Sequence, residues 1–320
     1  MGCDKRYHRP MKAALTCFLL FAACSRPTPP PADSPKAREA LTAPLEAASA
    51  PPTRAYEYPA ADRIVAIGDL HGDLAVTRRA LRLAGALGPD LADDHWHGGK
   101  LVVVQTGDTL DRGDDDRAVL DLLDHLRTEA PQAGGAFITM SGNHEVMNVA
   151  GDLRYVSRAS ASAFEQGRAQ AFAPGSAYAR VLANWPVIVK VGDSVFVHGG
   201  VLAEHVRYGI DKINSETAAW MRGEQPAPAV LMREDAPIWS RLYSSEPDGA
   251  ACAQLRQVLQ QLGAARMVVG HTPQLRGITA ACDGHVQRID TGMSHFYAGP
   301  LEVLVIEGGQ VRVLRAEVTP

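Results

Sequence analysis

Five short polar motifs combine acidic or imidazole side chains with glycine, and each follows a run of apolar residues. They are GDLHGD (68–73), GDTLDRG (107–113), GNHE (142–145), HGG (198–200) and GHTP (270–273). A tight loop needs glycine for its backbone angles, but it does not need Asp and His side by side. Carboxylate, amide and imidazole donors without a thiolate suit Mn, Fe or Zn in a catalytic site. The motifs therefore predict a metal centre.

The number of these donors favours two metal ions over one. Two-metal sites hold their ions about 3.5–4 Å apart and stabilise the attacking and leaving oxygens of a phosphoryl group together. A carboxylate has to bridge two cations that lie so close. Four of the eleven histidines fall in the motifs. Histidines that only pack in a core or lie on the surface would not gather in this way.

Predicted β-strands precede the motifs and alternate with helical patterns, which is typical of an α/β protein. The strands are predicted at 64–67, 101–105, 136–140, 195–197 and 266–269, the helices at 74–87 and 118–127, a hairpin at 187–197, and the last strands at 286–289 and 301–314. In open α/β sheets, ligands bind beyond the carboxyl ends of the strands. Five strand ends can therefore converge on one crevice.

Taken in order, the motifs resemble those of the calcineurin-like metallophosphoesterase superfamily, of the phosphoprotein phosphatase type, over residues 62–306. The resemblance implies an α/β fold, a β-sandwich flanked by α-helices with the metal site at strand ends. It also implies two divalent metal ions, Mn, Fe or Zn, with Asp108 bridging them. The implied metal ligands are Asp69, His71, Asp108, Asn143, His198 and His271.

The same resemblance implies three residues that serve the substrate. His144 is the general acid for the leaving group, Asp111 orients His144, and Arg112 binds the substrate phosphate. Chemistry agrees with these roles. A water bridging two metals loses its proton near neutral pH and can attack phosphorus. Arg112 can bind two phosphate oxygens in a fork, which a lysine cannot do, and a carboxylate partner would raise the pKa of His144.

Two further stretches resemble the branch called Shewanella-like phosphatases. They are GNHEVMNVAGDLRYV (142–156) and APIWSRLYS (236–244). This resemblance implies that Arg241 is a second phosphate-binding arginine. The branch includes enzymes that prefer phosphotyrosine, so the same preference is implied here. The expected function is that of a metal-dependent phosphomonoesterase that acts as a protein phosphatase on a phosphoprotein, a phosphopeptide or a small phosphoester.

Two alternatives stay open. One is an exported nucleotide or dinucleoside polyphosphate phosphoesterase with the same site. The other is a non-catalytic surface lipoprotein that holds metal only structurally, although such a protein would have no use for His144, Asp111 and Arg112. A formal net charge of −4 gives no sign of nucleic-acid binding.

The first residues predict export. Residues 1–24 combine basic residues, a short apolar run and Ala22-Ala23-Cys24-Ser25, which resembles the lipobox of bacterial lipoproteins. We expect a signal peptide, with Met1 or Met11 as its start, and a lipid on Cys24 as the only membrane contact. Ser25 favours the outer membrane on the periplasmic side of the envelope. The alternative is a cleaved signal and a soluble periplasmic protein.

Residues 25–59 are rich in Pro and Ala and predict a disordered tether. The phosphoesterase domain is expected at 60–320, with helical insertions at about 146–186 and 201–262. These insertions are expected to cover the crevice as a lid or to complete the core, and their clearest helices are 160–170 and 252–262. Cys252 and Cys282 either form a disulfide, which an exported compartment allows, or are two separate buried thiols. Asp290-Thr291-Gly292 resembles a turn near the site in related phosphatases.

Overall fold

The computed structural model describes residues 56–317. The predicted signal peptide, Cys24 and all of the tether up to residue 55 lie outside the described residues. None of the described helices combines the length and the apolar character needed to cross a bilayer.

Two β-sheets carry the predicted motifs. The first has the order β11-β10-β2-β3-β4 and contains β2 (Arg63–Ile67), β3 (Val102–Gln105), β4 (Ala136–Thr139), β10 (Glu302–Glu307) and β11 (Gln310–Arg315). The second has the order β1-β5-β6-β7-β9-β8 and contains β1 (Glu57–Tyr58), β5 (Ile188–Val191), β6 (Ser194–Val197), β7 (Arg266–Val269), β8 (Thr279–Ala281) and β9 (Val286–Arg288). Within each sheet, the strands that precede the motifs run parallel.

The two sheets pack face to face because alternate side chains of a strand point to opposite sides. Ala66 and Val104 of the first sheet share one buried cluster with Phe196 of the second. The next residues along the strands, such as Val65, point outward into clusters with the helices. Both faces of the central strands are therefore buried, which explains their continuous apolar runs.

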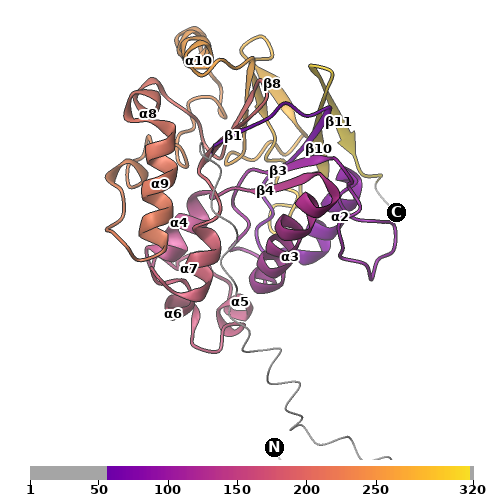
Figure 1. The fold of residues 1–320 in the computed structure, drawn as a ribbon, viewed down its shortest axis with the longest axis vertical. Coiled ribbons are helices and arrows are strands. Elements are labelled where there is room, and N and C mark those ends of the chain that lie inside the picture. Colours follow the sequence, from indigo (N-terminus) through magenta and orange to yellow (C-terminus); the bar gives the residue numbers. More distant parts are fainter. Residues whose placement is uncertain (1–55, 318–320) are drawn as a thin grey trace, which may run out of the picture. The chain divides into compact units, whose positions relative to one another are not determined.

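Helices cover the outer face of each sheet (Figure 1). On the first sheet these are α2 (Leu74–Ala84) and α3 (Asp116–Glu129). The helices that cover the second sheet belong to the two insertions. The remaining helical segments of the described chain are α4 (Asn143–Val149), α5 (Arg158–Ser162), α6 (Arg168–Phe172), α7 (Ala177–Leu182), α8 (Ala203–Tyr208), α9 (Ile210–Met221), α10 (Gly249–Leu262), η1 (Ala130–Ala133) and η2 (Ala229–Leu231). The α/β sandwich flanked by helices is confirmed.

Two expectations about individual segments need correction, and a third segment was missed. The tether does not extend to residue 59, because Glu57 and Tyr58 form β1 and pair in parallel with β5. The helix expected over 160–170 is two short helices, α5 and α6, separated by a turn whose Gly167 has a left-handed φ of 82°. The short strand β8 was not predicted, since Thr279–Ala281 carries too few apolar residues to signal a strand.

The insertions complete the core of the second sheet. Phe172, Ile213 and Leu255, one from each of α6, α9 and α10, are fully buried in the same cluster as residues of β6 and β7. Of the two readings of Cys252 and Cys282, the disulfide is confirmed. It joins α10 to the turn between β8 and β9, with a Cα–Cα distance of 5.2 Å.

Candidate active site

The loops that follow β2, β3, β6 and β7 are hydrogen-bonded to one another at the carboxyl ends of the strands. The backbone N–H groups of Leu70 and His71 both donate to the Asp108 carbonyl, at 3.0 Å. The N–H of Gly270 donates to the His198 carbonyl at 2.8 Å. The His198 ring then links the two sheets, since its Nδ1 donates to the Thr106 carbonyl at 3.0 Å. The motifs therefore share one site, as predicted.

The backbone of this site is held in an unfavourable conformation. Of the eight described non-glycine residues with positive φ, five belong to the motifs: His71, Asp108, Asp111, Arg112 and His271, with φ of 49° to 72°. Such a conformation costs of order 1–3 kcal/mol per residue and persists only where the surroundings impose it. The interlocked loops supply that constraint, so the donors are positioned before any ligand arrives.

Asp108 lies at the centre of the predicted metal ligands. Its Oδ2 is 3.1 Å from His198 Nε2 and 4.0 Å from His71 Nε2. Two groups of donor atoms, each within 4.8 Å, share this residue: His71, Asp108 and His144, and Asp108, His198 and His271. A carboxylate shared by two donor groups is what a bridging ligand requires.

Three histidines have the tautomer of metal ligands. One ring nitrogen of each donates to a backbone carbonyl: His71 Nδ1 to Leu110 at 3.2 Å, His198 Nδ1 to Thr106 at 3.0 Å, and His271 Nε2 to Trp239 at 3.1 Å. The other nitrogen then presents a lone pair to the site. Asn143 joins them, with its Oδ1 3.0 Å from His198 Nε2.

Asp69 completes the predicted set and has an acidic neighbour. Both of its oxygens accept from the His271 N–H, at 3.3 and 3.2 Å. Burial, together with the charges of Asp290 and Asp108, raises the pKa of Asp69 well above its usual value. Asp290 is itself buried, and its Oδ2 has no hydrogen-bond partner. Three buried carboxylates around one site need positive charge to stay ionised, so this donor set fits two divalent cations.

His144 is positioned differently from the other site histidines. Its Nδ1 lies 2.7 Å from Asp111 Oδ2, and a carboxylate only accepts, so Nδ1 carries the proton. Nε2 faces the donor cluster, 3.8 Å from Asp108 Oδ2. Burial lowers the pKa of His144, but Asp108 and Asp111 outweigh it and the net pKa is raised. This arrangement suits a proton donor whose ring is held by Asp111.

Glu145 is a site residue that was not predicted. Its buried carboxylate accepts four backbone N–H groups, those of Gly142, Asp108, Thr109 and Leu110, at 2.7–3.1 Å. It thereby ties the β3 loop to the start of α4. The signal in the sequence was a Glu three residues after the helix-capping position, Gly142. Gly142 has to be small, because a Cβ there would lie 2.3 Å from Asp108 Oδ1.

Arg168 of α6 is the second residue that was not predicted. Its side chain is buried, and the guanidinium lies against the rings of both Phe164 and Phe172, which contact each other. Its guanidinium donates to Asp111 Oδ1 at 3.2 Å and pairs with Asp116 Oδ2 at 2.8 Å. The first insertion therefore holds the carboxylate that orients His144. No spacing in the sequence marks this arginine among its neighbours.

The two predicted phosphate-binding arginines lie at the edge of the donor cluster. The Arg112 guanidinium lies 3.9 Å from the centre of the Tyr155 ring and 4.9 Å from that of Phe296. Within residues 56–317 no carboxylate pairs with it, and its buried Nε has no partner. Arg241 is exposed, and its Nη1 donates to the His271 carbonyl at 3.0 Å and to Thr272 Oγ1 at 2.8 Å.

Comparisons with known proteins identify the family. The family model described as calcineurin-like phosphoesterase matches residues 62–275. Shewanella-like protein phosphatase 2 of Arabidopsis thaliana is 38% identical over 302 residues, covering 78% of this chain and 76% of that protein. Shewanella-like protein phosphatase 1 of Plasmodium berghei (strain Anka) is 30% identical over 270 residues, covering 79% and 74%.

Solved structures give the same answer. The cold-active protein-tyrosine phosphatase of a psychrophilic Shewanella species aligns with a TM-score of 0.70 and 26% identity, covering 82% of both chains. A yeast serine/threonine phosphatase shares the fold, with a TM-score of 0.56 and 16% identity over 83% of this chain and 84% of that one. The chain therefore belongs to the calcineurin-like phosphoesterases, which are metal-dependent hydrolases, and within them to the branch of the Shewanella-like protein phosphatases.

Proposed function

We propose that this chain is a protein phosphatase that prefers phosphotyrosine. The observation that carries the proposal is the pairing of a proton donor, His144 held by Asp111, with a phosphate-binding Arg112 beside a divalent-metal donor set. A structural metal site needs neither of the first two. Neither of the other two functions, an exported nucleotide phosphoesterase or a non-catalytic lipoprotein, is favoured by a feature of this site.

The predicted ligands divide between two ions around Asp108. Asp69 and His71 would hold one ion, and Asn143, His198 and His271 the other. When bound, the ions supply charge to the phosphoryl oxygens and activate water for attack. Mn, Fe and Zn all suit this mixture of oxygen and nitrogen donors.

The chain's own groups orient the ester and release the product. Arg112 binds phosphate oxygens through its fork of N–H groups, and Arg241 approaches from the side of His271. His144 donates a proton from Nε2 to the departing oxygen, while Asp111 keeps the ring in place through Nδ1. The orphaned Arg112 Nε is a donor without a described acceptor, as expected where a phosphate binds.

Aromatic rings around Arg112 support the preference for phosphotyrosine. Tyr155 and Phe296 flank the guanidinium, and Tyr297 lies 5.3 Å from the His71 ring. Phe296 is 55% exposed, which is unusual for so large an apolar side chain. Flat apolar walls beside the phosphate group complement a phenyl ester better than a serine ester. The names of the structural relatives point to the same substrate.

Location in the envelope is a further part of the proposal. We propose a signal peptide at residues 1–24, acylation of Cys24, and a periplasmic position at the outer membrane, with a soluble periplasmic protein as the alternative. The disulfide between Cys252 and Cys282 supports an oxidising compartment.

The test uses the protein without residues 1–24, stripped of metal and then supplied with Mn, Zn or Fe. Matched phosphotyrosine and phosphoserine peptides are the substrates. We expect metal-dependent release of phosphate that is well above background for the phosphotyrosine peptide and lower for the phosphoserine peptide. Phe296→Ala should lower the ratio of phosphotyrosine to phosphoserine hydrolysis, whereas Leu91→Ala, at an even more exposed apolar side chain away from the site motifs, should not. Release from neither peptide with two metals bound would refute the proposal and favour a nucleotide or small phosphoester.

A further inference from the structure

A second group of metal-ligating side chains lies at the surface, apart from the active site. His125 and Glu129 are one turn apart on α3, so they project from the same face of the helix. His95 reaches them from the loop between α2 and β3. The side chains of His95, His125 and Glu129 are 69%, 43% and 24% exposed. An ion in solution can therefore reach all three.

Three donor atoms of this group face one another. His95 Nδ1 is 2.7 Å from Glu129 Oε1, His125 Nε2 is 3.1 Å from the same oxygen, and the two ring nitrogens are 3.4 Å apart. Zinc takes such donors at about 2.0–2.1 Å, which places neighbouring donors about 2.9–3.3 Å apart for angles between octahedral and tetrahedral. The three separations bracket this range, so one ion can contact all three atoms after small side-chain movements.

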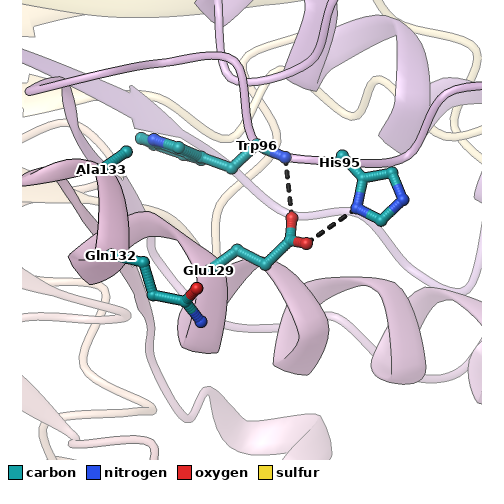
Figure 2. A pocket seen from close by; sticks show the side chains of 5 residues that line it. All are labelled: His95, Trp96, Glu129, Gln132 and Ala133. Atoms are coloured by element: carbon teal, nitrogen blue, oxygen red, sulfur yellow. Dashed lines mark hydrogen bonds and ion pairs between the residues drawn. The ribbon is translucent and has the colours of Figure 1, made fainter.

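Neighbouring contacts hold two of the donors in place. The Trp96 N–H donates to Glu129 Oε2 at 2.9 Å, which leaves Oε1 facing His95 (Figure 2) and, outside that view, His125. The N–H of His95 donates to Asp93 Oδ1 at 2.9 Å and fixes the loop from which the His95 ring projects. Figure 2 also shows the pocket at this place, which is lined by His95, Trp96, Glu129, Gln132 and Ala133.

We propose that His95, His125 and Glu129 bind one divalent transition-metal ion, with zinc as the best match, independently of the two ions of the active site. Two imidazoles and one carboxylate, with the remaining positions open to water, are a donor set that zinc takes in proteins. Among the residues that the structure describes, the active-site network meets α3 at Asp116, its first residue. Glu129 lies 13 residues further along the helix, about 20 Å away at 1.5 Å per residue. The two sites therefore share no ligand.

Metal stoichiometry tests the proposal directly. The untagged protein is stripped of metal and dialysed against zinc, and three equivalents are expected to bind. His125→Ala, on an exposed face of α3 where alanine is a good helix former, should bind two. His97→Ala is the matched control, since His97 lies in the same loop as His95 but its Nε2 pairs with Asp93. It should still bind three.

Trp96 gives a second readout that does not depend on catalysis. Copper(II) bound at the site should quench the fluorescence of the adjacent Trp96 indole, and Trp96→Phe identifies that part of the signal. In His125→Ala, the copper concentration that gives half-maximal quenching should rise more than tenfold. Its phosphatase activity should stay unchanged. Trp239, whose ring lies 5.7 Å from the His271 ring, reports separately on the active site.

The outcomes separate an ion site from a cluster held only by hydrogen bonds. Two zinc equivalents in the wild type, with copper quenching equal in wild type and His125→Ala, would overturn the proposal. Three equivalents that fall to two in both His125→Ala and His95→Gln, but not in His97→Ala, would establish it. Loss of the third equivalent in His97→Ala as well would place the ion elsewhere in the loop and also overturn it.

Discussion

At the scale of single residues, the histidines of the site are of two kinds, which differ in the group that accepts their ring N–H. The rings of His71, His198 and His271 each donate one N–H to a backbone carbonyl, so the lone pair of the other ring nitrogen can bind a metal. The His144 ring donates to a carboxylate, Asp111, which stabilises a positively charged ring. On the proposed function, the same side chain would therefore serve as a ligand or as an acid according to its second contact.

Replacing His144 tests this distinction. His144→Asn keeps a polar side chain but cannot supply a proton, so hydrolysis of alkyl phosphates, which have poor leaving groups, should fall by about 10²-fold or more. Hydrolysis of p-nitrophenyl phosphate should fall much less, because its leaving group departs without protonation. Both rates and the bound metal are measured. Equal losses for the two substrates, or loss of a metal ion, would indicate that His144 is a ligand and not the acid.

Glu145 permits a second test at this scale. Glu145→Gln replaces one acceptor oxygen by an NH₂ group, which cannot accept from the Asp108 and Gly142 N–H groups that now meet Oε2. A buried N–H without a partner costs about 1–3 kcal/mol, so the free energy of unfolding should fall by at least that much. Urea denaturation measures it. The matched change of the exposed Glu234 to Gln should leave stability within about 0.5 kcal/mol.

At the scale of the elements, the site depends on contacts between segments far apart in the sequence. The strands that precede the motifs were predictable, because both of their faces are buried and each apolar run stops at a glycine-containing motif. The break between α5 and α6 was missed, although Gly167, which has a positive φ of 82°, was a signal for it in the sequence. That break lets α6 deliver Arg168 to Asp111, so the local error and the missed residue have one cause.

Arg168 therefore provides the test for this element. Arg168→Met keeps an apolar contact with Phe164 and Phe172 but removes the charge that compensates the buried Asp111 and Asp116. Leaving buried charges unpaired costs about 3–5 kcal/mol, so the free energy of unfolding should fall by about that much. The turnover of alkyl phosphates should also fall, as in His144→Asn, because Asp111 would no longer be held in place. Chemical denaturation gives the free energy of unfolding. Kinetics at a temperature where the variant is folded give the turnover of alkyl phosphates. Arg158→Met, on the exposed face of α5, should change neither.

At the scale of the whole molecule, reasoning from open α/β sheets predicted one crevice but not two sheets. The pairing of β6 with β7 joins segments separated by the second insertion, and no local pattern reveals such a pairing. The convergence of the motifs was still predictable, because parallel strands present their carboxyl ends at one edge in either arrangement. Physical reasoning about the motifs predicted a metal centre at the strand ends, and the family resemblance supplied the sandwich and the role of each site residue.

Removing the disulfide tests how α10 is held against the β8–β9 turn of the second sheet. It ties α10, at the end of the second insertion, to the β8–β9 turn across 30 residues of chain. Closing a loop of that length in the unfolded state is worth about 3–4 kcal/mol. Reduction of the wild type should therefore lower its melting temperature and leave activity at low temperature intact, because neither cysteine belongs to the site motifs. The Cys252→Ser/Cys282→Ser variant should melt at the temperature of the reduced protein and ignore the reductant. A variant that melts like the oxidised wild type would show that packing of α10 alone holds this region.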